Sequence, residues 1–263
     1  MEIEPYFQPI ISPSDGRLHG AEVLARLRLP AGEVPADDAT IRLAESAGLT
    51  LPLTEALFER LIDYRARLRP LNLAFLAVKL SATALDDQPS VALIKTLVLV
   101  RTLIDGLAGC CQLRVVLTEA AAIADSRPRH GLTAQISRGD ASPVMDGVGA
   151  GSGSIRTLTE LPFDTVKIDP SFLAEMFDST KARRLLLAII TLGRGLGLKV
   201  VAAGVETPTQ QQVLIEPGAA MGHDHRCGPP MDINTFVQSC GETAGAAGGP
   251  PAAAAAAKPA AGT

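Results

Sequence analysis

The chain has 263 residues, 47% hydrophobic and 20% charged, which is enough apolar material for one or two domains with a packed core. Its net charge of −4 argues against sequence-independent binding of nucleic acid. The absence of Trp argues against binding of single-stranded nucleic acid by stacking of bases on aromatic side chains. No run of about 20 apolar residues is present, and the opening MEIEPYFQP lacks the pattern of a signal peptide. We therefore expect a cytoplasmic protein without a membrane partner.

Short β-type runs alternate with helical patterns along the first 242 residues. Strands are expected at residues 4–11, 18–25, 73–80, 113–118, 143–146, 165–168, 199–203 and 219–221. Helices are expected at residues 41–47, 53–68, 90–108, 120–125, 128–137, 180–196 and 208–215. This alternation predicts an α/β fold with a mostly parallel sheet. Eight strands in about 220 residues favour a (β/α)8 TIM-like barrel over the main rival, a doubly wound open sheet.

The two ends of the chain add detail to this fold. Residues 12–17, SPSDGR, separate the first two strands, and their Asp-Gly step predicts an antiparallel hairpin, so the first strand of the barrel is expected to be antiparallel. From Thr243 onward the sequence is almost wholly Ala, Gly and Pro and offers no large apolar side chain to bury. We expect one domain over residues 1–242 and a disordered tail over residues 243–263.

Cysteine and histidine spacing gives little sign of a metal. The chain has four cysteines without CxxC spacing, Cys110, Cys111, Cys227 and Cys240, and reduced thiols are expected. The H-x-H-x-C run of His223, His225 and Cys227 is not a recognised zinc spacing and has no evident fourth ligand. A solvated loop is the favoured interpretation of that run.

In parallel barrels the functional residues lie at the carboxyl ends of the strands. The polar residues expected there are Glu22, Arg26, Lys79, Ser81, Glu119, Asp146, Lys167, Asp169, Glu206, His223 and His225. Several have plain structural alternatives: Glu22 and Arg26 share a strand face and form an ion pair, Asp146 lies in a turn, Asp169-Pro170 is loop, and Glu206 precedes a helix start. Lys167 is costly if unpaired on an apolar strand, so it is expected to meet Asp146 or Glu22.

Five segments in this order resemble the EAL family, the cyclic di-GMP phosphodiesterase domain, over residues 3–238. They are FQPI, GAEVLAR, LAESAGL, LPFDTVKIDPSF and LGLKVVAAGVETPTQ. The resemblance implies a site in which two divalent cations activate a water that attacks one phosphodiester bond. Val23 gives EVL in place of EAL, which resembles pilus-regulating receptors that bind the nucleotide without metals.

The departures from the family pattern fall on the residues that hold the metals. Lys79 replaces an Asn, His223 replaces a Gln, and residues 148–154, VGAGSGS, lack the aromatic residues of the family's loop. Three acidic positions are lost, at Val116, Gly147 and Ala203, while Glu119 and Glu206 remain. The resemblance leaves Glu22 and Asp146 as the carboxylates of the site. Two carboxylates beside an added lysine supply too few ligands for two divalent cations.

We therefore expect a catalytically inactive receptor for cyclic di-GMP, without catalytic residues or a metal cofactor. The resemblance implies nucleotide contacts from Gln8, Glu22, Val23, Leu24, Arg26, Lys79, Asp146 and Lys167. Two alternatives stay open: a protein-interaction regulator of motility that no longer binds the nucleotide, and a weak cyclic di-GMP phosphodiesterase. In the receptor interpretation Lys79 binds the ligand, whereas in a dead pocket it only pairs with Glu22. A regulatory protein partner is expected, and a homodimer is left open.

Overall fold

A computed structural model describes residues 2–11, 18–28, 46–80, 91–118, 133, 136–137, 141–149, 154–203, 205, 207–215, 221–223 and 228–245. Its strands are β1 (Glu2–Ile11), β2 (Leu18–Arg28), β3 (Phe75–Leu80), β4 (Gln112–Thr118), β5 (Ala141–Val148), β6 (Thr165–Ile168), β7 (Lys199–Ala203) and β8 (Met221–His223). Every strand expected from the sequence has a counterpart in the described residues, and residues 219 and 220 of the last expected strand lie outside them. The short β-type runs between helical patterns therefore located the strands.

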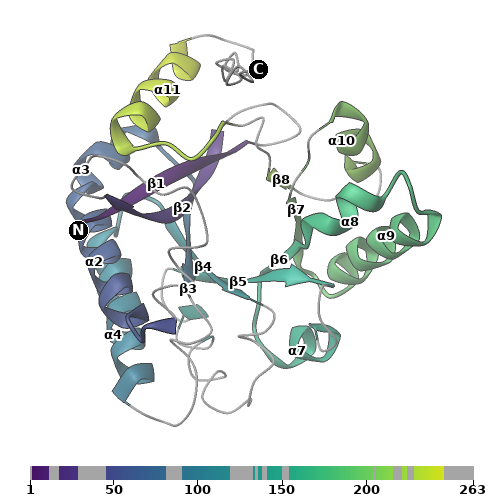
Figure 1. The fold of residues 1–263 in the computed structure, drawn as a ribbon, viewed down its shortest axis with the longest axis horizontal. Helices are drawn as coiled ribbons and strands as arrows, with labels where there is room; N and C mark the ends of the chain where they lie inside the picture. Colours follow the sequence, from purple (N-terminus) through teal and green to yellow (C-terminus); the bar gives the residue numbers. More distant parts are fainter. Residues whose placement is uncertain are drawn as a thin grey trace, which may run out of the picture.

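The strands form one sheet in chain order that curls on itself (Figure 1). β1 runs antiparallel to β2, and all later neighbours are parallel. In the segment that follows β8, the backbone of Met231 exchanges two N–H···O hydrogen bonds of 2.8 and 3.0 Å with that of Phe7 on β1. These bonds bring the last segment of the barrel to its first strand. The expected TIM-like barrel with an antiparallel first strand is confirmed.

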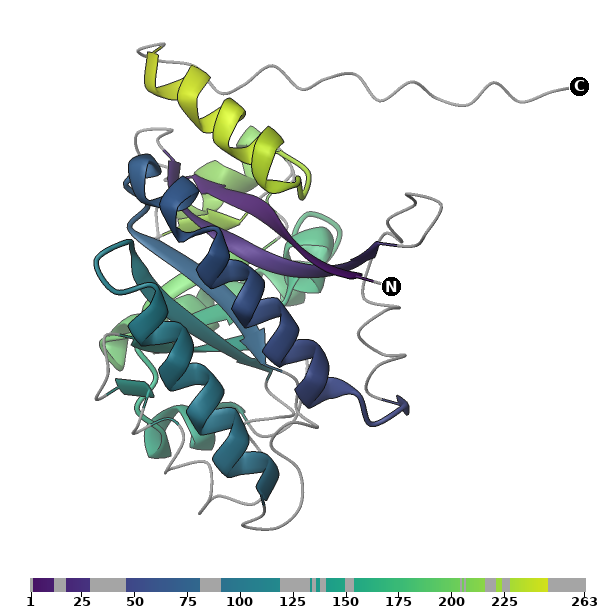
Figure 2. The same cartoon turned by 90° about the vertical axis from the view of Figure 1, so that its left-hand side faces the viewer.

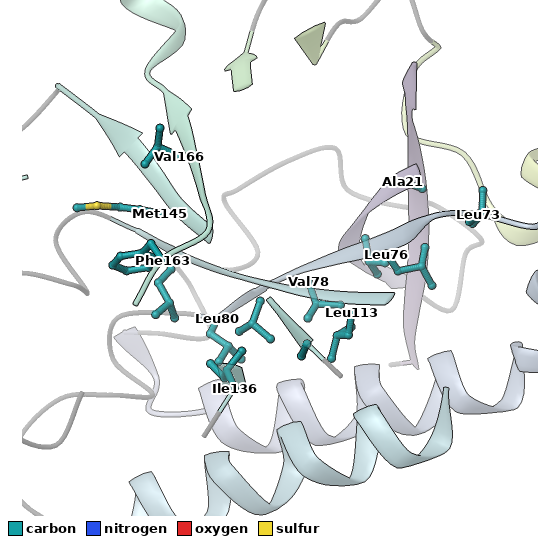
Figure 3. Close-up of a cluster of buried hydrophobic side chains, with 14 of the residues drawn as sticks. Ala21, Leu73, Leu76, Val78, Leu80, Leu113, Ile136, Met145, Phe163 and Val166 are labelled. Atoms are coloured by element: carbon teal, nitrogen blue, oxygen red, sulfur yellow. The ribbon is translucent and has the colours of Figure 1, made fainter. Parts of the chain in front are cut away.

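Each central strand separates two apolar environments, and β3 shows how. Leu76, Val78 and Leu80 belong to the core between the sheet and the helices (Figure 3). The alternate residues Phe75 and Ala77 belong to a second cluster inside the barrel. A strand buried on both faces needs a nearly continuous apolar sequence, which FLAVKL supplies. The one charged residue of that run lies near the carboxyl end of the strand, at the barrel mouth.

The helices cover the outside of the barrel. They are α2 (Thr50–Asp63), α3 (Arg65–Leu68), the short 3-10 helix η1 (Arg69–Leu71), α4 (Val91–Gly106), α7 (Ser154–Glu160), α8 (Pro170–Glu175), α9 (Thr180–Gly195), α10 (Pro208–Ile215) and α11 (Ile233–Gly245). α2 and α4 pack side by side along one flank (Figure 2). The expected helices at residues 41–47, 120–125 and 128–137 lie wholly or largely outside the described residues. No helix in the described ranges has the length and hydropathy to span a bilayer.

Helix α8 corrects the interpretation of Asp169-Pro170 as loop. The Asp169 carboxylate accepts a hydrogen bond from the Ser171 N–H at 2.9 Å, and Pro170 occupies the first helical position. A carboxylate acceptor followed by proline satisfies the free N–H groups of a helix start, so this pair begins a helix. α10 begins in a similar way, because Thr207 and Gln210 exchange reciprocal side chain–backbone hydrogen bonds.

The last helix, α11, was not expected from the sequence. Asp232 accepts hydrogen bonds from the N–H groups of Asn234 and Thr235, which caps the first turn. The Phe236 ring stacks on Phe7 with centroids 5.1 Å apart, and both side chains are fully buried. α11 therefore packs on β1, and it extends to Gly245, three residues past the expected end of the globular part. The rest of the expected tail lies outside the described residues.

Candidate functional site

Two charged side chains from opposite parts of the sheet meet inside the barrel. Lys167 lies on β6 and Glu22 on β2, 145 positions apart, and the Lys167 Nζ donates to Glu22 Oε2 at 3.0 Å. Only 11% of the Lys167 side chain and 8% of the Glu22 side chain are exposed. The expectation that Lys167 meets a site carboxylate is confirmed. Its neighbours Val166 and Ile168 on β6 are apolar, so the buried ammonium needs a carboxylate partner to compensate its charge.

Asp146 extends this ion pair toward solvent. Its carboxylate lies 3.9 Å from the Lys167 Nζ and 3.5 Å from the Lys79 Nζ. The side chain of Asp146 is 19% exposed and that of Lys79 is 38% exposed. Glu22, Lys167, Asp146 and Lys79 thus form a chain of alternating charge that runs from the barrel interior to its mouth. We call these four residues the mouth charge chain.

The structure corrects one alternative for Lys79. In the dead-pocket interpretation Lys79 pairs with Glu22, but its carboxylate partner among the described residues is Asp146. Glu22 is engaged by Lys167, which is more deeply buried and reaches it at a shorter distance. The partner of Lys79 is thus the outer, more hydrated carboxylate, and Lys79 stays partly in solvent.

The environment of Lys167 fixes its charge. Burial alone lowers the pKa of this lysine, but the Coulomb attraction of Glu22 and of Asp146, together with the hydrogen bond to Glu22, raises it above the ordinary value. Lys167 is therefore a cation at neutral pH. It can balance a carboxylate or donate to an anionic oxygen, and it cannot serve as a general base.

The other residues named for nucleotide binding divide between two faces of β1 and β2. Gln8 lies directly opposite Glu22 in the strand pair and is buried beside it. Leu24 and Arg26 follow Glu22 at alternate positions and are half-buried, and Arg26 donates to the Ala25 carbonyl at 3.3 Å. Val23 is 2% exposed and belongs to the core between sheet and helices, so the expectation that it contacts a ligand is not supported.

Val116 and Gly147 stand at positions where the family pattern has a carboxylate, and their surroundings differ. Val116 is fully buried in the apolar cluster inside the barrel. Gly147 lies at an irregularity of β5, has φ of +75°, and would place an added Cβ where no atom lies within 4 Å. The remaining candidates lie outside the described residues or have undescribed side chains: Ser81, Glu119, Ala203, Glu206, His223, His225 and Cys227.

Sequence reasoning missed Arg114. This arginine lies on β4, two residues before Val116, and is 6% exposed. It lines a small cavity inside the barrel together with Glu22, Lys167, Phe75, Val116 and Thr165. The sequence signal for Arg114 was a lone arginine in the apolar run QLRVVLT. It lies two residues from Val116, so both side chains are expected on the inner face of the strand. The charge of Arg114 therefore contributes to the electrostatic potential of the site, with or without direct contact to a ligand.

The cysteines take no part in this site. Cys110, Cys111 and Cys240 form no disulfide among the described residues and pack against the core outside the barrel. Burial raises the pKa of Cys111 to about 12 and of Cys240 to about 11, so neither is a thiolate at neutral pH. These three positions are compatible with the expected reduced thiols, and Cys227 is outside the described residues.

Among the described residues, the donor set does not fit the two divalent cations that the family resemblance implies. A divalent ion in oxygen coordination needs several oxygen ligands, and a pair needs both ions held close together. Glu22 and Asp146 are the described carboxylates at the mouth, and a lysine ammonium engages each of them. No group of three or more metal-binding side chains occurs in the described part of the chain. Two divalent cations at the mouth would also have to compete with the ammonium groups of Lys79 and Lys167 for the same two carboxylates.

The fold and the mouth charge chain can be compared with known proteins. A model of the EAL domain matches residues 1–223. The chain belongs to the EAL domain family. Its sequence is 32% identical over 225 residues to the cyclic di-GMP phosphodiesterase NbdA of Pseudomonas aeruginosa, covering 82% of this EAL protein and 27% of NbdA. It is 28% identical over 253 residues to the cyclic di-GMP phosphodiesterase PdeL of Escherichia coli, covering 90% and 64%.

Solved EAL structures have the same fold. The PaMucR phosphodiesterase in its c-di-GMP complex has a TM-score of 0.75 and 26% identity, covering 89% of this chain and 94% of that one. The FimX EAL domain of Pseudomonas aeruginosa bound to c-di-GMP has a TM-score of 0.73 and 20% identity, covering 88% and 91%. This EAL domain chain spans less than two thirds of the length of NbdA and of PdeL.

Proposed function

We propose that this EAL domain is a cyclic di-GMP receptor that binds the nucleotide without hydrolysing it. The observation that carries the proposal is the mouth charge chain, in which lysines engage both described carboxylates of the site. The family supplies the ligand, because relatives are named as cyclic di-GMP phosphodiesterases and related EAL domains are solved with c-di-GMP bound. The proposal places the protein in the cytoplasm, with the nucleotide as its partner and no metal cofactor.

Charge balance explains how such a site takes the nucleotide. Cyclic di-GMP carries two phosphate negative charges, which need cations nearby. At this mouth one cation is gained at Lys79 and three acidic positions are lost, at Val116, Gly147 and Ala203. Lys79 pairs with Asp146 at only 3.5 Å and is 38% exposed, so exchanging that contact for a phosphate oxygen costs little. Lys79 thus provides the charge that a metal provides elsewhere in the family.

The same geometry argues against hydrolysis. Activation of a water by two metals depends on a full set of carboxylate ligands. Glu22 is held by Lys167 in the barrel interior, and Val116 places an apolar side chain where the family has a carboxylate. No catalytic base replaces the metals in the described part of the mouth, since Lys167 is protonated at neutral pH.

The remaining contacts follow from the family resemblance and from the strand geometry. Gln8 and Leu24 lie next to Glu22 on β1 and β2, where they position the nucleotide. Arg26 forms no ion pair within the described residues, and its half-buried guanidinium is free to donate to a phosphate.

One observation favours the second candidate, a protein-interaction regulator without nucleotide. The mouth charge chain contains two lysines and two carboxylates, so it is self-neutralising and can persist in a pocket without a ligand. In that case a protein partner, or a second copy of the chain, would carry the signal. A weak phosphodiesterase is the third outcome.

Calorimetric titration with cyclic di-GMP, with and without EDTA, separates these candidates. A receptor binds equally well in EDTA and leaves the nucleotide intact. Absence of binding at high micromolar nucleotide contradicts the receptor and favours the protein-interaction regulator. Binding that requires magnesium and is followed by release of linear pGpG establishes a phosphodiesterase.

A further inference from the structure

Arg114 is held inside the barrel by an aromatic ring. Its guanidinium carbon lies 3.5 Å above the centroid of Phe75 on the neighbouring strand. Phe75 can occupy this place because Gly20 on β2 has no side chain: an added Cβ would lie 2.8 Å from the ring. Stacking on an aromatic face favours a buried guanidinium but does not cancel its charge.

No carboxylate among the described residues forms an ion pair with Arg114. Its Nε is buried without a hydrogen-bond partner in the described part of the chain. Burial lowers the pKa of Arg114 and the field of the Asp164 carboxylate raises it, but the guanidinium stays charged at neutral pH because arginine starts from a very high value. A buried cation of this kind costs stability, so its presence calls for a compensating role.

Arg114 shares its cavity with the inner end of the mouth charge chain. Glu22 and Lys167 line the same cavity, and their charges cancel each other. The two lysines of the mouth charge chain are each paired with a carboxylate, whereas Arg114 has only the field of Asp164, with which it forms no ion pair among the described residues. The charge of Arg114 lies below the mouth, on β4 two residues before Val116, behind low-dielectric walls that transmit its field.

We propose that Arg114 is a positioning residue that acts through its field: it attracts the phosphates of a ligand at the mouth without touching them. The inference deepens the proposed function and rests on it for the identity of the ligand. An anionic ligand at the mouth adds a second negative charge in the field of Arg114, beside that of Asp164. A neutral ligand gains nothing from Arg114, so this residue selects phosphate-bearing molecules.

The variants Arg114→Met and Arg114→Lys separate charge from packing. Methionine matches the length of arginine and keeps a favourable sulfur–aromatic contact with Phe75, but removes the charge. We expect Arg114→Met to bind cyclic di-GMP roughly tenfold more weakly, the effect of unit charges about 10 Å apart at an effective dielectric constant of about 20. Its melting temperature should equal or exceed that of the wild type, since a buried unpaired charge has been removed. Arg114→Lys should keep the affinity.

A charge-matched control is Arg101→Met, which removes an exposed arginine paired with Asp105 on α4. It should leave affinity unchanged. Wild-type affinity in Arg114→Met, or equal losses in Arg114→Met and Arg114→Lys, overturns the inference, because a structural role predicts lower stability without a charge-specific loss of binding.

A second probe keeps this test independent of the proposed function. If the wild type fails to bind cyclic di-GMP, thermal stabilisation by inorganic pyrophosphate is measured instead. Stabilisation of the wild type and of Arg101→Met, but not of Arg114→Met, supports the field of Arg114 while the receptor proposal fails. Absence of stabilisation in the wild type overturns both.

Discussion

Lys167 reaches across the barrel to Glu22 and donates to its carboxylate at 3.0 Å, so one ion pair joins β6 to β2. Both side chains are almost fully removed from solvent. A buried pair of this kind is costly to break from one side, because the remaining partner becomes an unpaired buried charge. The contact therefore has consequences for stability that can be measured without any ligand.

A double-mutant cycle tests this ion pair. Lys167→Met removes the cation that lies 3.0 Å from the buried Glu22 carboxylate and should lower the free energy of unfolding by about 3 kcal/mol. Glu22→Gln should cost less, because Asp146 still lies 3.9 Å from the Lys167 Nζ. The double variant should be clearly more stable than the sum of the single losses predicts, as urea unfolding would show. Additive losses would mean that the two side chains do not interact.

The raised pKa of Lys167 predicts an alkaline limit to its contribution. A lysine whose pKa is higher in the folded state stabilises the fold fully below its ordinary value of 10.5, and the contribution is lost as pH rises through the folded value. The difference in unfolding free energy between wild type and Lys167→Met should therefore be constant from pH 7 to pH 9. It should shrink only above the ordinary value of 10.5. A difference that disappears on acidification alone, with none of it lost at high pH, contradicts this assignment.

Purified protein should not hydrolyse cyclic di-GMP with magnesium or manganese. The changes at Lys79, Val116, Gly147 and Ala203 act on one site, so restoring Val116→Glu alone should leave the protein inactive. Chromatography of linear pGpG measures this directly. Gly147→Asp is sterically admissible, since an added Cβ meets no atom within 4 Å and aspartate tolerates positive φ better than most residues. The informative variant therefore restores all four positions together, and turnover by the unaltered chain would contradict the prediction.

The sequence was sufficient for features that depend on periodicity or on charge balance. Strand alternation located the barrel, and the cost of an unpaired lysine predicted that Lys167 meets Glu22 or Asp146. It could not choose the partner of Lys79, because that choice depends on how far each side chain projects into the mouth. Arg114 was missed because its position depends on Phe75, whose ring fits only beside Gly20. No local pattern records such a three-strand arrangement.

The C-terminal helix and the tail should differ sharply in their effect on stability. Deleting the residues after Gly245 should change the melting temperature by no more than a few degrees, because that segment contains no large apolar side chain. By contrast, Phe236→Ala removes a fully buried ring stacked on Phe7 and should cost about 3–5 kcal/mol. Thermal and urea unfolding of the two variants provide the measurement. A large loss of stability in the deletion variant would show that the tail packs on the barrel.

Arg26 and Lys79 should carry the salt-dependent part of nucleotide binding. Arg26 makes only a weak hydrogen bond to the Ala25 carbonyl, and Lys79 a long ion pair with Asp146, so both can turn to phosphate oxygens. Arg26→Ala should weaken cyclic di-GMP binding by one to two orders of magnitude, since charge-assisted hydrogen bonds are worth about 1.5–3 kcal/mol each. Lys79→Ala should act in the same direction and also flatten the decline of affinity with rising salt.

Exposed residues on α9 provide matched controls for these two variants. Arg183→Ala and Lys181→Ala remove the same charges from the outside of the barrel and should leave affinity unchanged. Titrations of all four variants in EDTA at two salt concentrations give the comparison. If Lys79→Ala binds as tightly as Lys181→Ala, the lysine that replaced the family's asparagine does not meet the phosphate. Its contact with Asp146 then serves only to balance that carboxylate, and the loss in Arg26→Ala alone would have to account for nucleotide recognition.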